Sequence, residues 1–137
     1  MNTILLIDDN VEILENLTEY LVIKGYTILG ANNGKMGIEL ASTFKPDLII
    51  CDALMPEMDG HEVLRLLMEN GSTHEIPFIF STSMSEVIDR NEALQLGADD
   101  YIIKPFELEN LLCMVKMWVK AGSKRLKFQH YENTKVH

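Results

Sequence analysis

The chain has 137 residues, of which 47% are hydrophobic and 24% charged, which fits one globular domain with a normal core. Its net charge of −9 is uneven: residues 123–137 carry four basic side chains against one acidic one, so the remainder carries −12. The strong negative charge of residues 1–122 argues against direct nucleic-acid binding by the domain. No apolar run approaches the roughly 20 residues of a membrane-spanning helix.

The cysteines and the start of the sequence point to a cytoplasmic protein. Cys51 falls in a predicted buried strand and Cys113 in a predicted helix, which fits reduced thiols better than a disulfide framework. The N-terminal residues lack the basic region and long apolar core of a signal peptide. We expect one domain over residues 1–121 and a basic C-terminal tail or linker stub over residues 122–137.

Short apolar runs alternate with helical patterns along the whole chain. The predicted strands cover residues 4–7, 26–29, 47–51, 78–81 and 101–103. The predicted helices cover residues 11–24, 34–44, 60–69, 84–96 and 106–121. Five strands alternating with five helices predict an α/β fold with a doubly wound parallel sheet. The expected strand order is the flavodoxin-like 2-1-3-4-5, in which ligands bind where the first and third strands lie side by side.

Two of the predicted strands end abruptly in carboxylates. The run over residues 4–7 leads into Asp8 and Asp9, and the run over residues 48–51 leads into Asp52. Three such groups close together repel one another, so one pKa should rise, and replacing Asp52 or Asp8 by Asn should stabilise the metal-free protein. A hard divalent cation would remove this repulsion, and Mg²⁺ prefers oxygen ligands. The strand ends hold no His or Cys cluster of the kind that binds zinc.

Two further strand ends supply groups suited to phosphoryl chemistry. The fourth strand leads into Thr82 and the fifth into Lys104. A hydroxyl and an ammonium at the same edge could bind phosphoryl oxygens. Asp52 at the centre would be the nucleophile, since a carboxylate can form an aspartyl-phosphate.

Each of these residues also has a simpler interpretation when taken alone. Asp8 and Asp9 could favour the first helix by lying at its N-terminus. Thr82 could be a capping hydroxyl and Lys104 a solvated lysine. The Asp59-Gly60 pair is typical of a turn and a helix cap. What favours one shared site is that every polar group follows the end of its own predicted strand.

Four stretches also carry a family resemblance: Asp8-Asp9 and the segments over residues 52–60, 77–82 and 97–106. With their spacing, they make residues 3–121 similar to the receiver domain of two-component response regulators. The resemblance implies that Asp52 accepts a phosphoryl group from a sensor histidine kinase or a phosphotransfer protein. It implies a Mg²⁺ site in which Asp9, Asp52 and the backbone carbonyl of Leu54 are the protein ligands and Asp8 holds the water shell of the metal. It further implies that Thr82 and Lys104 contact the phosphoryl oxygens.

The resemblance implies a conformational switch as well. Movement of Thr82 toward the phosphoryl group would let Tyr101 rotate inward and change the surface formed by residues 84–96, 101–103 and 106–121. The Lys104–Pro105 peptide bond is expected to be cis. Such a domain catalyses its own phosphorylation and dephosphorylation and has no external metabolic substrate, so we do not expect an enzyme in the usual sense.

The last predicted helix carries two apolar stripes. The stripe expected to face the sheet comprises Leu108, Leu111, Leu112, Val115 and Val119. The second comprises Met114, Met117 and Trp118, residue types that favour partner surfaces. A helix that is apolar on two sides is either unusually buried or meets a partner, and of these we expect an interface with a second copy, an output domain or another protein, and no contact with a membrane.

Three alternative functions are weighed against the receiver. A flavodoxin-like cofactor binder would need a phosphate-binding loop after the first strand, where the carboxylates of Asp8 and Asp9 would repel a phosphate. A phosphoaspartate hydrolase usually has its nucleophile at the end of the first strand, whereas Asp52 follows the third. A degenerate receiver that acts only as a scaffold is disfavoured because all five expected site residues are present.

Overall fold

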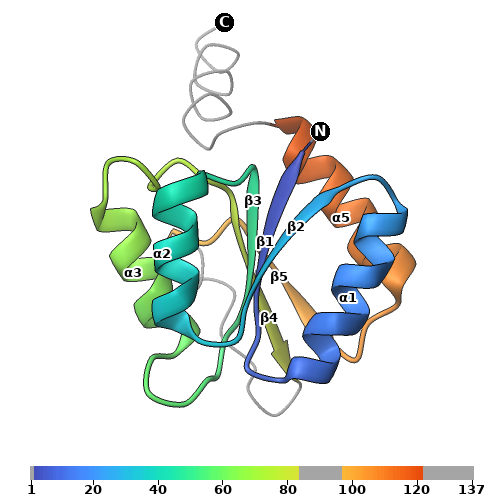
Figure 1. The fold of residues 1–137 in the computed structure, drawn as a ribbon, viewed down its shortest axis with the longest axis horizontal. Helices are drawn as coiled ribbons and strands as arrows, with labels where there is room; N and C mark the ends of the chain where they lie inside the picture. Colours follow the sequence, from blue (N-terminus) through green and yellow to red (C-terminus); the bar gives the residue numbers. More distant parts are fainter. Residues whose placement is uncertain (1, 84–96, 122–137) are drawn as a thin grey trace, which may run out of the picture.

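The computed structural model describes residues 2–83 and 97–121, which form a parallel five-stranded sheet covered on both faces by helices (Figure 1). The strand order is β2-β1-β3-β4-β5, as predicted. The strands are β1 (Thr3–Ile7), β2 (Thr27–Ala31), β3 (Leu48–Asp52), β4 (Phe78–Ser83) and β5 (Asp100–Lys104).

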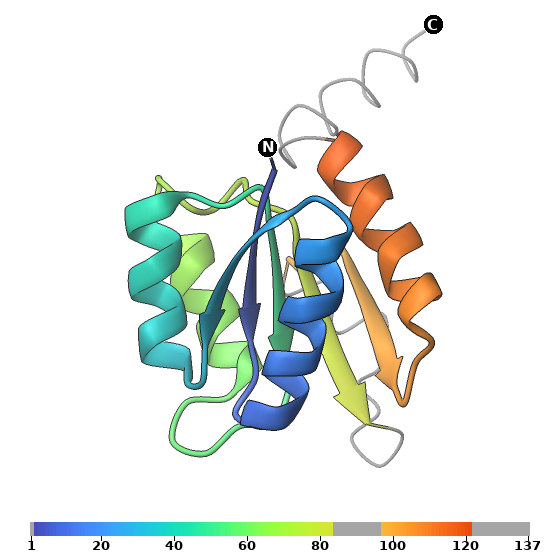
Figure 2. The same ribbon diagram turned by 45° about the vertical axis from the view of Figure 1, so that its right-hand side comes forward.

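The described helices divide between the two faces of the sheet. They are α1 (Val11–Ile23), α2 (Gly34–Phe44), α3 (Gly60–Glu69) and α5 (Leu108–Ala121). α1 and α5 lie on one face, and α2 and α3 lie on the other (Figure 2). The predicted helix over residues 84–96 and the predicted tail over residues 122–137 fall outside the described residues. No helix in the described part of the chain is long and apolar enough to cross a membrane.

Three helices begin with a side-chain cap close after a strand or loop. Asn10, Asn33 and Asp59 accept hydrogen bonds from the backbone N–H three residues ahead, at 3.1, 2.8 and 3.0 Å. These bonds satisfy N–H groups that have no partner inside the helix. Each cap fixes the helix start at the edge of the sheet where the strands end, which is the edge that carries the polar residues.

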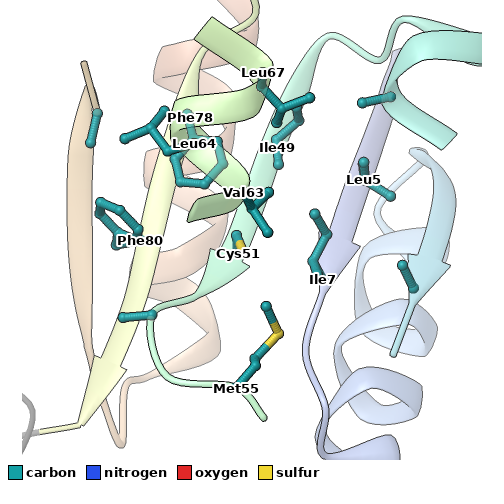
Figure 3. Packing of buried hydrophobic residues seen from close by; sticks show 14 residues of the cluster. Leu5, Ile7, Ile49, Cys51, Met55, Val63, Leu64, Leu67, Phe78 and Phe80 are labelled. Carbon is teal, nitrogen blue, oxygen red and sulfur yellow. The ribbon is translucent and has the colours of Figure 1, made fainter. Parts of the chain in front are cut away.

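The core has two layers because the central strands are buried on both faces. Figure 3 shows the layer under α2 and α3, where alternate residues of β1, β3 and β4 meet residues of α3. Cys51 lies in this layer and is fully buried, while Cys113 on α5 is exposed. The opposite layer joins Ile4, Leu6, Leu48, Ile50 and Ile79 to residues of α1 and α5.

The structure corrects the predicted orientation of α5. The residues that α5 buries are Leu111, Val115 and Trp118. Trp118 is only 6% exposed, so the prediction that it lies on a partner-facing stripe is wrong. Leu108, expected on the buried face, is 40% exposed. Val115 follows Leu111 by four residues and Trp118 follows Val115 by three, so these residues share one face of the helix. The face that packs on the sheet is therefore centred on these residues and not on the predicted stripe.

The other two interface candidates on α5 differ in exposure. Met117 is 53% exposed and remains available to a partner. Met114 is half-buried and packs against the core layer under α1 and α5. The interface role of both residues stays a prediction, since no partner chain is present.

Candidate functional site

The predicted polar residues meet at one edge of the sheet because of the strand register. Ile7 pairs with Cys51, so Asp8 and Asp52 follow on neighbouring strands. Asp52 pairs with Ser81, and Ser83 pairs with Lys104 at the end of β5. The carboxyl ends of β1, β3, β4 and β5 therefore bring their terminal side chains to a common edge.

Three carboxylates form the centre of this edge. Asp8, Asp9 and Asp52 each offer an oxygen, and these oxygens lie within 4.8 Å of one another. Asp8 and Asp52 are buried, at 4% and 7% exposed, whereas Asp9 is exposed. Oxygen donors at this spacing fit a hard divalent cation such as Mg²⁺. Within the described residues, this is the one group of three or more acidic, His or Cys side chains that could hold a metal ion.

Lys104 faces two of the carboxylates. Its Nζ lies 3.1 Å from Asp8 Oδ2, where it donates a hydrogen bond, and 3.6 Å from Asp52 Oδ2. Asp8 is also oriented by the backbone N–H of Asn10, which donates to its Oδ1 at 2.9 Å. The Lys104–Pro105 bond is cis, as predicted. The cluster thus holds three carboxylates and one ammonium, which leaves negative charge for a cation to neutralise.

Among the three carboxylates of this cluster, the pKa of Asp52 is clearly shifted. Its burial, the charge of Asp8 and a hydrogen bond with Asp9 raise the pKa of Asp52 to about 6, although Lys104 and the Leu54 backbone N–H act in the opposite direction. The prediction that one carboxylate has a raised pKa is confirmed for Asp52. Burial opposes charge on Lys104, but its hydrogen bond to Asp8 and the charges of Asp8 and Asp52 raise its pKa.

The other predicted site residues surround this cluster. Thr82 is buried, and its Oγ1 donates to the Ser83 carbonyl at 3.4 Å. Tyr101 is half-buried and packs against the core layer that contains Phe80. Leu54, which follows Asp52 by two residues in the sequence, is 59% exposed.

Sequence reasoning missed two backbone features of the loop after Asp52. A Cβ on Gly60 would lie 2.5 Å from the Asp52 carbonyl oxygen and 2.9 Å from Ala53 Cα, so only glycine fits there. Glu57 has a positive φ of 67°, and its turn is closed by the Met58 N–H donating to the Pro56 carbonyl at 2.7 Å. The one available signal was the glycine directly after the capping Asp59, and the Asp59-Gly60 pair by itself predicts a turn and a helix cap but not this close backbone approach.

A mainly apolar groove of about 480 Å³ adjoins Lys104. It lies between α1 and the segment that leads from β5 into α5. Its walls are Ile13, Asn16, Leu17, Ser83, Lys104, Pro105, Phe106 and Leu108.

Comparison with known sequences adds a family-level finding. The family model described as response regulator receiver domain matches residues 4–116. The transcriptional regulatory protein PcoR of Escherichia coli is 40% identical over 122 residues, which cover 89% of this chain and 53% of PcoR. The response regulator MprA of Mycobacterium leprae is 37% identical over 113 residues, covering 82% of this chain and 49% of MprA. The chain therefore spans about half the length of these relatives.

Solved structures resemble the fold closely. The signal receiver domain of a signal transduction histidine kinase from Syntrophus aciditrophicus has a TM-score of 0.78 and 34% identity, covering 88% of this chain and 92% of that one. The receiver domain of the Francisella response regulator 1452 has a TM-score of 0.80 and 28% identity, covering 88% and 98% of the two chains. Each match covers most of both chains.

Proposed function

The chain belongs to the response regulator receiver domain family of two-component systems, and from this membership we propose that Asp52 is its phospho-acceptor. Phosphorylation of Asp52 would then switch the surface of the domain between two states. The observation that carries the proposal is the cluster of Asp8, Asp9 and Asp52 facing Lys104. Buried like charges at a strand edge are costly, which favours a chemical role over a purely structural one.

The proposed reaction is transfer of a phosphoryl group from a phosphohistidine. An Asp52 carboxylate oxygen forms a bond to phosphorus while the phosphorus–nitrogen bond breaks, and the electron pair of that bond stays with the imidazole. The Lys104 ammonium, now 3.6 Å from Asp52, would bind a phosphoryl oxygen, and the Thr82 hydroxyl would donate to another. Hydrolysis of the acyl phosphate would return Asp52 to its carboxylate, so the domain would act on itself and on no external metabolite.

The residues present fit a bound Mg²⁺. Asp8, Asp9, Asp52 and the Leu54 backbone carbonyl would hold the ion. When bound, it would neutralise the carboxylates and the phosphoryl oxygens during transfer. Asp8 also keeps Lys104 in place through the 3.1 Å contact, so it would serve both the ion and the lysine.

The proposed partners follow from the edge of the sheet and from α5. A sensor histidine kinase or phosphotransfer protein would bring its phosphohistidine over this edge, and the apolar groove beside Lys104 supports its docking. The switch would run through Thr82 and Tyr101 to the surface made by residues 84–96, β5 and α5. An output domain or a second copy would bind there, with Met117 as an exposed contact. A cytoplasmic location remains our expectation.

The proposal is tested by intact mass spectrometry after incubation with a small-molecule phosphodonor. We expect wild-type protein with Mg²⁺ to gain one phosphoryl group, and protein with a metal chelator or with Asp52→Asn to gain none. Asp59→Asn is the matched control, because Asp59 lies in the same loop but caps α3. Wild-type protein without an adduct, or an Asp52→Asn variant with one, would contradict the proposal and favour a scaffold role.

A further inference from the structure

Asp100, the first residue of β5, holds two parts of the molecule with one carboxylate. Its Oδ1 accepts a hydrogen bond from the Tyr101 backbone N–H at 2.9 Å. Its Oδ2 accepts one from Trp118 Nε1–H at 3.3 Å. Trp118 lies near the end of α5, so this carboxylate joins the C-terminal part of that helix to the beginning of β5.

The side chains of Trp118 and Tyr101 lie on opposite sides of the sheet. Trp118 is part of the core layer under α1 and α5, whereas the Tyr101 side chain packs against the layer that contains Phe80. Neighbouring residues of a strand point to opposite faces. Asp100 therefore connects Trp118 on α5 to the backbone of Tyr101 on β5. The Tyr101 side chain lies on the other face of the sheet, and β5 ends in Lys104.

We propose that Asp100 and Trp118 are positioning residues that fix α5 on β5, so that a change at Tyr101 or Lys104 moves the exposed face of α5 with the strand. The signalling consequence rests on the proposed function. Apolar packing alone holds a helix without direction, whereas a hydrogen bond to a charged acceptor fixes its orientation. The face carried by α5 includes Met117, which is 53% exposed.

Two substitutions remove the contact in different ways. Asp100→Asn replaces one of the two acceptor oxygens by an NH₂ group, which is itself a donor, so the Tyr101 and Trp118 bonds cannot both keep their present geometry. Trp118→Phe removes the donor and keeps an aromatic ring in the core. Asp99→Asn is the matched control: it removes the neighbouring carboxylate, whose Oδ2 accepts from the Phe78 N–H at 2.9 Å.

The first measurement is amide hydrogen exchange by mass spectrometry in the unphosphorylated protein. We expect amides of residues 114–121 to exchange on the order of tenfold faster than in wild type in both Asp100→Asn and Trp118→Phe. The double variant should exchange no faster than either single variant, because both substitutions remove the same contact. Asp99→Asn should leave these amides at the wild-type rate. Unchanged exchange in Asp100→Asn, or a uniform increase over every element, would overturn the proposal.

The second measurement uses Trp118 as a reporter, since it is the only tryptophan in the chain. We expect its emission to change on phosphorylation in wild type and Asp99→Asn, and the change to fall to about half or less in Asp100→Asn at equal adduct by intact mass. An equal change in Asp100→Asn, or an adduct without any change in wild type, would overturn the positioning role. Wild type without an adduct would refute the proposed function, and the exchange comparison would then decide the α5–β5 contact by itself.

Discussion

At the scale of single residues, the raised pKa of Asp52 makes the stability of the metal-free protein depend on pH. Burial raises its pKa to about 6, so the folded state keeps a proton that the unfolded chain, with an ordinary aspartate pKa of about 3.9, has already lost. Between these two pKa values the folded state binds more protons than the unfolded state, and stability falls as pH rises. Above pH of about 6 the full cost of a charged Asp52 is present.

Replacing Asp52 should therefore stabilise the metal-free protein in a pH-dependent way. We expect Asp52→Asn to raise the free energy of unfolding by about 1–3 kcal/mol at pH of about 7.5, and the gain to disappear by pH of about 4. Urea denaturation with a chelator, repeated across this pH range, measures it. A gain of the same size at both ends of the range would contradict this account.

Asp8 provides the matched comparison. It was expected from the sequence to behave like Asp52, but the structure shows it accepting hydrogen bonds from Lys104 and the Asn10 N–H. An amide at this position would lose the charge that pairs with a half-buried ammonium. Asp8→Asn should thus give a smaller gain than Asp52→Asn, or none.

At the scale of elements, the loop between β3 and α3 is set by close backbone contacts. The Gly60 N–H donates to the Ala53 carbonyl at 2.9 Å, which brings the start of α3 against the end of β3. A side chain on Gly60 would press on the Asp52 carbonyl oxygen and Ala53 Cα, which are backbone atoms that cannot rotate aside. This loop therefore fixes the backbone of Asp52 itself.

We expect Gly60→Ala to lower the free energy of unfolding by about 1–3 kcal/mol and to slow phosphorylation of Asp52. Gly71→Ala is the control, because a Cβ there meets nothing within 4 Å, and its effect should stay within about 0.5 kcal/mol. Thermal or urea unfolding and a time course of intact mass report the two quantities. Equal effects of the two substitutions would show that the backbone near Gly60 accommodates a Cβ at little cost in free energy, which would contradict this account.

The elements also show which information the sequence carries. Each described helix and strand was predicted, because abrupt changes between apolar runs, glycines and caps are local signals. The orientation of α5 was predicted incorrectly, because both apolar groups on this helix have helical spacing and the spacing alone does not show which residues face the sheet. The contact at Gly60 and the positive φ of Glu57 depend on how distant backbone segments approach, and no local pattern encodes them.

At the scale of the whole molecule, the site was predictable because the fold gathers strand ends. Periodicity gave the strands, but only the flavodoxin-like order made Asp8 and Asp52 neighbours, and that order was a fold-level inference which the structure confirms. The partner surfaces were less predictable, because exposure depends on packing between elements. The helix predicted over residues 84–96 stays a prediction.

The concentration of negative charge at one edge makes the stability of the whole domain sensitive to divalent cations. An ion that binds only the folded state at 100 times its dissociation constant adds about 2.7 kcal/mol. We expect Mg²⁺ to raise the melting temperature by several degrees above an ionic-strength control. Asp9→Asn should lose most of this shift, whereas Glu39→Gln, on the exposed side of α2, should retain it. If Mg²⁺ raised the melting temperature of Asp9→Asn as much as that of wild type, the ion would bind at another site.

The two thiols differ in a way that has a practical consequence. Cys51 is fully buried one residue before Asp52, and its burial and the charge of Asp52 raise the pKa of its thiol, whereas Cys113 is exposed on α5. An alkylating reagent should therefore modify Cys113 rapidly and reach Cys51 only when the middle of the sheet opens. The rate of the second alkylation measures how often β3, the strand that ends in Asp52, separates from its neighbours, and a ligand that binds only the folded state would slow this alkylation.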